Sequence, residues 1–186
     1  DALKLVDFVK TKWKNINVVI CNVGNGQSVP PAKETFVDWQ SSFSINLWSA
    51  TNIIENLIEP LTISKGVIIC ISSICGNEYV PGAPITYSCA KAALNHYVKT
   101  ISWPLADRGI RINAISPGNI IFPGSTWENK YLNSKDSVQS YLDENVALKR
   151  FGTPEEISKF ACFLASDNAS FATGSIFTID GSQTRS

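Results

Sequence analysis

The sequence predicts an α/β protein in which helices cover both faces of a parallel sheet. Short apolar runs of four to six residues alternate with longer segments whose apolar residues recur at helical spacing. The short runs are apolar throughout, which is typical of parallel strands buried on both faces. The chain contains no internal repeat, low-complexity tract or linker, so we expect residues 1–186 to form a single domain.

The first half of the chain is expected to contain two strands separated by a long helical region. The first apolar run ends at Asn22 and Gly24, which are typical turn residues and mark the end of a buried strand. In chain order we expect a helix over 1–14, a strand over 18–21, a loop at 28–31, a helix over 32–61 with one break near 41–42, and a strand over 66–71.

The second half repeats this alternation and contains the clearest helix start. Thr153 is a good N-cap, Pro154 suits the first turn, and Glu155 and Glu156 face the helix dipole favourably. In chain order we expect a helix over 85–106, a strand over 110–115, a loop over 117–133, a helix over 134–148, a helix over 153–165, and a strand over 175–179.

Composition and charge argue against several classes of function. Lysine plus arginine and aspartate plus glutamate each number 16, so nothing indicates a nucleic-acid partner or an anionic membrane. No apolar run is long enough to span a bilayer. The single histidine and the absence of a Cys-x-x-C pair argue against a metal site, so we expect none. The five cysteines predict reduced thiols in a cytoplasmic protein.

The start of the chain suggests that it is a piece of a longer protein. The sequence contains no methionine, and its first residues already follow a helical pattern. We therefore expect the N-terminal part of the protein to be missing.

Tyr87 and Lys91 are the strongest candidates for catalysis. They lie four residues apart in a predicted helix, which puts them on one face, one turn apart. A tyrosine hydroxyl has a reference pKa of roughly 10, and a nearby ammonium group would lower it. Such a tyrosine can exchange a proton with an alcohol or carbonyl oxygen. The pair alone is a weak signal, because this spacing also arises by chance on many helices.

The surrounding segments make the signal specific. Residues 71–76 (Ile-Ser-Ser-Ile-Cys-Gly) end a predicted strand, where ligands bind in open α/β sheets. Together with residues 87–94 (Tyr-Ser-Cys-Ala-Lys-Ala-Ala-Leu), they resemble the short-chain dehydrogenase/reductase family, which shows Ile-Ser-Ser-x-x-Gly followed by Tyr-x-Ala-Ser-Lys-Ala-Ala. The resemblance continues, in the order of the family, at residues 18–24, 44–47, 111–118, 151–156, 163–167 and 173–181.

The resemblance implies a fold, an activity and roles for individual residues. It implies a Rossmann-like, doubly wound sheet and transfer of hydride between NAD or NADP and an alcohol or carbonyl substrate. Tyr87 would be the acid/base, Lys91 would lower its pKa and hold the nicotinamide ribose, and Ser73 would orient the substrate oxygen. Asn46 would hold a water in a proton relay. The implied cofactor-binding residues are Tyr87 and Lys91, with Asn22 and Gly24 on the adenosine side and Pro117, Gly118 and Ile120 beside the nicotinamide.

Two departures from the family pattern limit these expectations. The family often has a threonine where this chain has Phe122, so its cofactor contact is lost or supplied by Ser125 or Thr126. The family's glycine-rich turn, Thr-Gly-x-x-x-Gly-x-Gly, is absent, so we expect the first strands of the sheet to be missing. We therefore expect this chain to bind cofactor weakly or not at all. The alternative function is a non-catalytic fragment that serves as a binding or assembly module.

The substrate and the assembly are expected from less specific features. Residues 117–148 mix aromatic, amide and hydroxyl groups, which suits a polar small molecule, including a sugar-like one, as well as a simple ketone. The predicted helix 85–106 is apolar nearly all round, and a helix of this kind should be buried. Since members of the family that the chain resembles commonly pair through two long helices, the resemblance implies a homo-oligomer, a dimer or tetramer, that pairs through this helix and residues 43–61.

Overall fold

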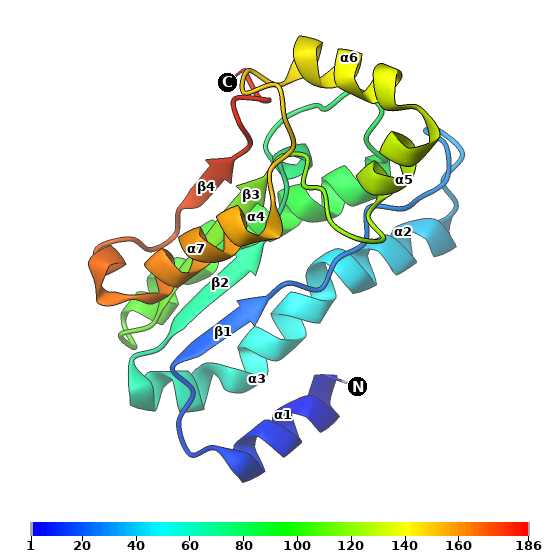
Figure 1. The fold of residues 1–186 in the computed structure, drawn as a ribbon. Helices are drawn as coiled ribbons and strands as arrows, with labels where there is room; N and C mark the ends of the chain where they lie inside the picture. The colour runs from blue at the N-terminus through cyan, green and yellow to red at the C-terminus, as the bar shows by residue number, and fades with distance from the viewer. Residues whose placement is uncertain (1, 186) are drawn as a thin grey trace.

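Four parallel strands form one sheet in the computed structural model, which describes residues 2–185 (Figure 1). The strands follow the order β1-β2-β3-β4, and Cys21 of β1 lies beside Cys70 of β2 in the register. The predicted parallel sheet is confirmed, and each predicted strand agrees with the structure to within two residues at each end. The strands are β1 (Val18–Cys21), β2 (Val67–Ile71), β3 (Arg111–Pro117) and β4 (Ile176–Ile179).

One face of the sheet packs against α3 (Ser49–Ser64) and α4 (Ile85–Ala106). Ile68 and Cys70 of β2 point into this core, and both are fully buried. α1 (Ala2–Lys12) lies outside α3 and adds Val6 to the same core (Figure 1). The helix predicted over 85–106 is thereby confirmed with both of its bounds.

The opposite face packs against α7 (Pro154–Ala165). Val67 and Ile69, which alternate with the β2 residues of the first face, are buried here. Alternate residues of one strand thus enter two different cores, which explains why the strands are apolar throughout. β1 is an exception, because its Ile20 side chain remains 54% exposed.

The long helical region expected over 32–61 is divided differently. Ala32 has a φ of 63°, outside the right-handed helical region, so helix cannot begin there. α2 (Phe36–Phe43) begins instead at a capping box formed by Thr35 and Asp38. The expected break is not at 41–42: the chain stays helical and widens into a π-helical turn, η1 (Ser44–Trp48), before α3.

Two helices stand beyond the carboxyl ends of the strands, where only one was expected (Figure 1). The prediction of a loop over 117–133 is wrong for its second half, which forms α5 (Thr126–Asn133). The cause is the N-cap Ser125, whose hydroxyl accepts a hydrogen bond from the Glu128 amide at 3.1 Å. α6 (Lys135–Asn145) follows directly and is shorter than the predicted helix. No helix of the described part of the chain is long and apolar enough to cross a membrane.

The predicted single domain extends to residues 1 and 186, which lie outside the described residues. Between them, two short 3-10 turns complete the helical elements: η2 (Ile74–Gly76) and η3 (Asp167–Ala169). η2 lies directly after β2 and leads toward the loop that precedes α4.

Candidate active site

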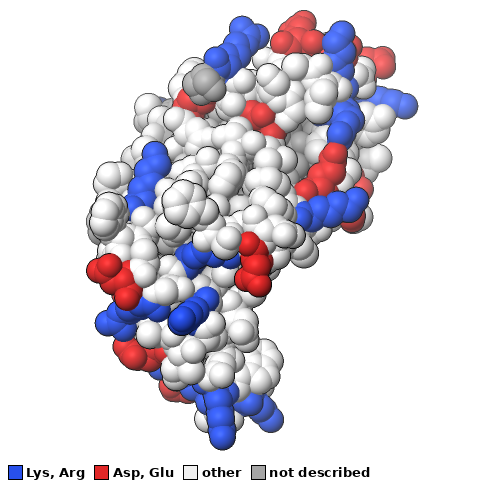
Figure 2. Space-filling view, turned by 90° about the vertical axis from the view of Figure 1, so that its left-hand side faces the viewer, with Lys and Arg blue, Asp and Glu red and all other residues white. Residues whose placement is uncertain are grey.

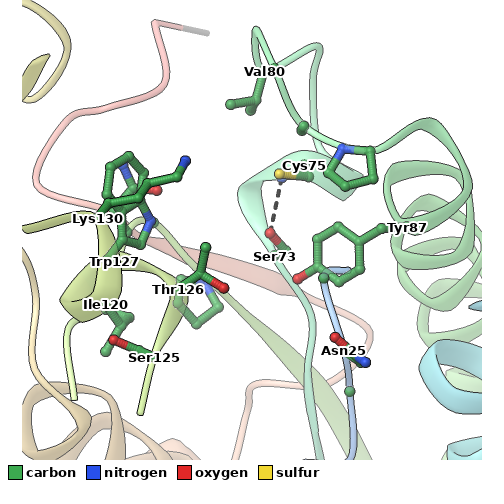
Figure 3. Close-up of a pocket in the computed structure, with 18 of the residues that line it drawn as sticks. Asn25, Ser73, Cys75, Val80, Tyr87, Ile120, Ser125, Thr126, Trp127 and Lys130 are labelled. Atoms are coloured by element: carbon green, nitrogen blue, oxygen red, sulfur yellow. Dashed lines mark hydrogen bonds between the residues drawn. The ribbon is translucent and has the colours of Figure 1, made fainter. Parts of the chain in front are cut away.

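A cavity of about 820 Å³ opens at the carboxyl ends of the strands. One wall consists of the loop after β1, η2 and the start of α4, and the other consists of the loop after β3 with α5 and α6 (Figure 3). We call these the catalytic wall (residues 22–26, 71–75 and 80–91) and the outer wall (residues 117–141). Of the residues expected in the site, the cavity lining includes Asn22, Gly24, Ser73, Tyr87, Lys91, Pro117, Gly118 and Ile120.

Ser73 is held by the tight turn that ends β2. Its hydroxyl accepts a hydrogen bond from the Cys75 amide at 3.2 Å and caps η2 (Figure 3). Gly76 lets this turn pack against α4, because a Cβ atom there would lie 2.6 Å from the Lys91 carbonyl carbon. The Ser-Ser-x-x-Gly segment therefore brings Ser73 against the helix turn that carries Tyr87.

Tyr87 is half-buried in the catalytic wall, and its hydroxyl faces the cavity near Ser73 (Figure 3). Burial raises the pKa of Tyr87 above its ordinary value, the Ser73 hydroxyl opposes this, and the Cys75 thiol adds to it. The expectation that Lys91 lowers the pKa of Tyr87 is wrong for this structure. The larger effect is the loss of water around the phenol, which disfavours the charged phenolate.

Lys91 is buried, and its amine points toward the end of β2. Its Nζ donates a hydrogen bond to the Ile71 carbonyl oxygen at 2.8 Å and lies 5.9 Å from the centre of the Tyr87 ring. Burial lowers the pKa of Lys91 to about 8, although the nearby Cys70 and Cys21 thiols oppose that effect. One carbonyl leaves the amine with hydrogens still to donate, and Lys91 also lines the cavity.

Asn46 is the predicted site residue that does not line the cavity. It is 1% exposed in η1, and its amide nitrogen donates to the backbone oxygens of Asn25 and Ser42, each at 3.0 Å. Its amide oxygen accepts from the Asn25 backbone nitrogen at 2.9 Å. The side chain therefore holds the loop after β1 in place from behind, and its role in a proton relay stays a prediction.

The loop after β1 lines the cavity partly with glycine residues, which have no side chains. A Cβ atom on Gly24 would lie 3.2 Å from both the Lys91 Nζ and the Asn46 Oδ1, and one on Gly26 would lie 3.9 Å from the Tyr87 ring. A nicotinamide ribose fits this surface, because its two hydroxyls can accept from Lys91 and no side chain stands in the way. Gly24 and Gly26 therefore suit the nicotinamide half of the cofactor that the family implies, whereas Gly24 was expected on the adenosine side; the cofactor-binding role of Gly24 stays a prediction.

Pro117, Gly118 and Ile120 follow the end of β3 and form the boundary between the two walls. Gly118 packs closely on the turn after β4, since a Cβ atom there would lie 2.7 Å from the Asp180 Cβ. Ser125, suggested as a substitute cofactor contact, already caps α5, whereas Thr126 is exposed and lines the cavity. Thr126 is thus the better placed of the two hydroxyls.

Several lining residues were not singled out from the sequence. Cys75 lines the cavity beside Ser73 in the same turn, Asn25 follows Gly24 and is hydrogen-bonded through its backbone to Asn46, and Lys130 lies on the outer wall (Figure 3). The place of Cys75 in the site could have been predicted, because it falls inside the Ser-Ser-x-x-Gly segment. The place of Lys130 could not, because its segment was expected to be a loop.

Comparison with known proteins identifies the family. The family model described as enoyl-(acyl carrier protein) reductase matches residues 1–184. The chain is 35% identical over 171 residues to the 3-oxoacyl-[acyl-carrier-protein] reductase FabG of Chlamydia trachomatis, covering 91% of this chain and 66% of that protein. It is 34% identical over 181 residues to the isoepoxydon dehydrogenase patN of Aspergillus clavatus, covering 95% and 68%. The chain thus spans about two thirds of the length of these relatives.

A solved structure agrees with this result. L-sorbose reductase of Gluconobacter frateurii, in complex with NADPH and L-sorbose, superposes with a TM-score of 0.92 at 26% identity, over 100% of this chain and 73% of that one. The chain belongs to the short-chain dehydrogenase/reductase family of oxidoreductases, whose members use NAD or NADP. The predicted Rossmann-like fold and family are confirmed.

Proposed function

We propose that this chain is the catalytic part of an NAD(P)-dependent oxidoreductase that acts on a small alcohol or carbonyl compound. The observation that carries the proposal is the catalytic wall, where Ser73 and Tyr87 face one cavity and Lys91 lies one helical turn away. Hydroxyl, phenol and amine are the groups that move and hold a proton beside a carbonyl oxygen.

Each of these residues has a distinct part in the reaction. The nicotinamide, when bound, exchanges hydride with the substrate carbon. Ser73 donates a hydrogen bond to the substrate oxygen, and Tyr87 gives that oxygen its proton during reduction or accepts it during oxidation. Lys91, one helical turn from Tyr87, holds the ribose hydroxyls through the hydrogens that its amine still has to donate. Burial raises the pKa of Tyr87 above a value that is already well above neutral, so the phenol carries its proton at neutral pH and can donate it during reduction.

Replacing Tyr87 by Phe in the full-length protein tests the proposal. We expect carbonyl reduction to fall by at least about a hundredfold, because the proton donor is lost, while cofactor binding persists. The matched control is Tyr79→Phe, which removes the same hydroxyl from a side chain that is 85% exposed and does not line the cavity. Retained activity in Tyr87→Phe would exclude this tyrosine as the acid/base.

A second candidate is a binding or assembly module that cannot hold cofactor. It is favoured by β1, which lies at the edge of the described sheet with Val18 and Ile20 exposed. Titrating the 186-residue chain with NADH and NADPH, followed by cofactor fluorescence, tests the module. We expect weak or no binding by this chain alone, and micromolar affinity would contradict the module; the oxidoreductase is tested separately by Tyr87→Phe in the full-length protein.

The assembly we propose is a homo-oligomer, either a dimer or a tetramer, built on α3 and α4. Fewer apolar residues of α4 need a partner than the sequence suggested, because Leu94, Val98 and Leu105 are buried within the chain's own core. Trp103 on α4 and Trp48 at the start of α3 remain 80% and 41% exposed, and these are the apolar groups that a partner would cover. A monodisperse monomer in light scattering at tens of micromolar would contradict it.

We also propose a cytoplasmic location, since all five cysteines are free thiols.

The substrate we propose is a polar small molecule, including sugar-like ones. The outer wall offers hydroxyl and amide groups at Thr126, Asn133 and Tyr141, which can bind the hydroxyls of such a molecule. A panel of ketones and ketoses on the full-length protein tests this class. Activity restricted to acyl-thioester ketones would count against a sugar-like substrate.

A further inference from the structure

The charged residues described in the cavity lining are all positive. Among the described residues that line it, the charged side chains are Lys91 and Lys130, and there is no aspartate or glutamate. The outside of the molecule is different, because positive and negative side chains are interspersed on the face that Figure 2 shows. The cavity is therefore positive within a chain whose formal net charge is zero.

The two lysines stand on opposite walls and differ in their surroundings. Lys91 is buried in the catalytic wall and is engaged by the Ile71 carbonyl. Lys130 is exposed on α5 and belongs to no ion pair among the described residues. Glu128, two residues earlier on α5, does not line the cavity, and its carboxylate accepts a hydrogen bond from the Gly124 amide at 2.6 Å. Lys130 thus brings a positive charge without an ion-pair partner to the lining of the cavity.

An aromatic cluster keeps the Lys130 amine at the cavity. The Nζ lies 4.5 Å from the centre of the Trp127 ring, within the range of a cation–π interaction. Trp127 is itself fixed, with ring centres 5.0 Å from Tyr141 and 5.2 Å from Phe151. Figure 3 shows the amine on the side of the cavity that faces Ser73 and Tyr87. The Trp127 ring, engaged in this way, positions a cation instead of offering a free surface for stacking.

From these contacts we propose that the substrate carries an anionic group, a carboxylate or a phosphate, and that Lys130 binds it. Ser73 and Tyr87 hold the carbonyl end of the same molecule on the opposite wall. The inference rests on the proposed function and refines it, because it makes Lys130 the residue that selects anionic substrates. No aspartate or glutamate among the described residues that line the cavity opposes such a ligand.

Matched pairs of carbonyl compounds test this inference in the full-length protein. One pair is fructose 6-phosphate and fructose, and the other is acetoacetate and its methyl ester, so that phosphate and carboxylate are separated. For Lys130→Met we expect the KM of the anionic member to rise about tenfold, because a charge-assisted contact is lost, and that of the neutral member to stay unchanged. Lys130→Arg should retain most of the preference. Raising the salt concentration should weaken it in the wild type.

Lys135→Met is the matched control. This lysine also lies over an aromatic ring, 5.6 Å from the centre of Tyr131, but it does not line the cavity. Equal losses on charged and neutral substrates in Lys130→Met, or a change in the cofactor KM alone, would overturn the proposal.

Failure of the proposed function would look different. In that case the wild type would reduce none of the four compounds, and calorimetric binding of fructose 6-phosphate and acetoacetate would decide for Lys130. Tighter binding by the wild type than by Lys130→Met supports the anion site, and equal or undetectable binding by both contradicts it.

Discussion

The two walls of the cavity are built in different ways. The catalytic wall grows out of the sheet: Ser73 follows β2 directly, Lys91 is hydrogen-bonded to Ile71 at the end of that strand, and Asn46 holds the loop after β1 from behind. The outer wall lies beyond the strands and is formed mainly by α5 and α6. These helices pack on a small hydrophobic cluster that includes Trp127. Most of its residues are exposed.

This difference suggests a division of labour. Groups that transfer a proton must be held in fixed positions, and a buried, hydrogen-bonded turn at the end of a strand provides this. Groups that choose the substrate can lie on a surface segment, which can change its sequence without disturbing the sheet. The comparison can be sharpened by variants that loosen one wall at a time.

The largest effect is expected for the buried charge of Lys91. Its pKa of about 8 lies below the ordinary value for lysine, roughly 10.4, so between these two pH values the unfolded chain binds the proton that the folded chain has lost. The contribution of Lys91 to the free energy of unfolding should therefore rise with pH across this window, and the full cost of burying its charge is present below pH 8. The expected gain is on the order of 3 kcal/mol.

Denaturant unfolding between pH 7 and about pH 10 measures this gain by comparing wild type with Lys91→Met. The variant should lack the rise, so its advantage over the wild type shrinks as the pH increases. Lys99→Met, which changes an exposed lysine of the same helix, is the control. A wild-type profile parallel to that of Lys91→Met would show that the amine is not desolvated as the structure has it.

A somewhat smaller effect is expected for Asn46→Ala. The change leaves the buried Asn46 site without the amide that pairs with the Asn25 backbone, so the free energy of unfolding should fall by about 1–3 kcal/mol. The KM for cofactor should rise, because the loop that carries Gly24 is no longer held. Asn56→Ala is the control, since that amide only donates to the Asn52 carbonyl on the exposed side of α3. Unchanged stability and unchanged cofactor KM together would mean that Asn46 does not position the loop.

The smallest effect is expected on the outer wall, for Ser125→Ala. Loss of the α5 cap should lower the free energy of unfolding by about 1 kcal/mol and raise the substrate KM, while kcat changes little. Ser140→Ala, at an exposed position of α6, serves as its control. A large fall in kcat would contradict the division between the walls, because it would tie the chemistry to α5.

The sequence predicted the catalytic wall better than the outer wall, for physical reasons. The catalytic wall is marked by patterns between residues close in sequence: the helical spacing of Tyr87 and Lys91, and the strand end before Ser73. Such local patterns can be recognised from the sequence alone. α5 was missed because its polar residues give little periodic signal, and its cap at Ser125 also suits a loop. The direction of the Tyr87 pKa was wrong because burial depends on neighbours distant in sequence. The place of Lys130 opposite Ser73 could be recognised only in the structure, because it depends on α5.

The most direct test of the account follows the hydride itself. The full-length protein is given NADPH with deuterium at the transferable position of the nicotinamide, together with fructose 6-phosphate or acetoacetate, and the alcohol is analysed by mass spectrometry. We expect the wild type to place the deuterium on the former carbonyl carbon and Tyr87→Phe to form almost none of this product while still binding NADPH. Labelled alcohol formed equally well by Tyr87→Phe would contradict the central claim that Tyr87 of the catalytic wall carries out the proton transfer.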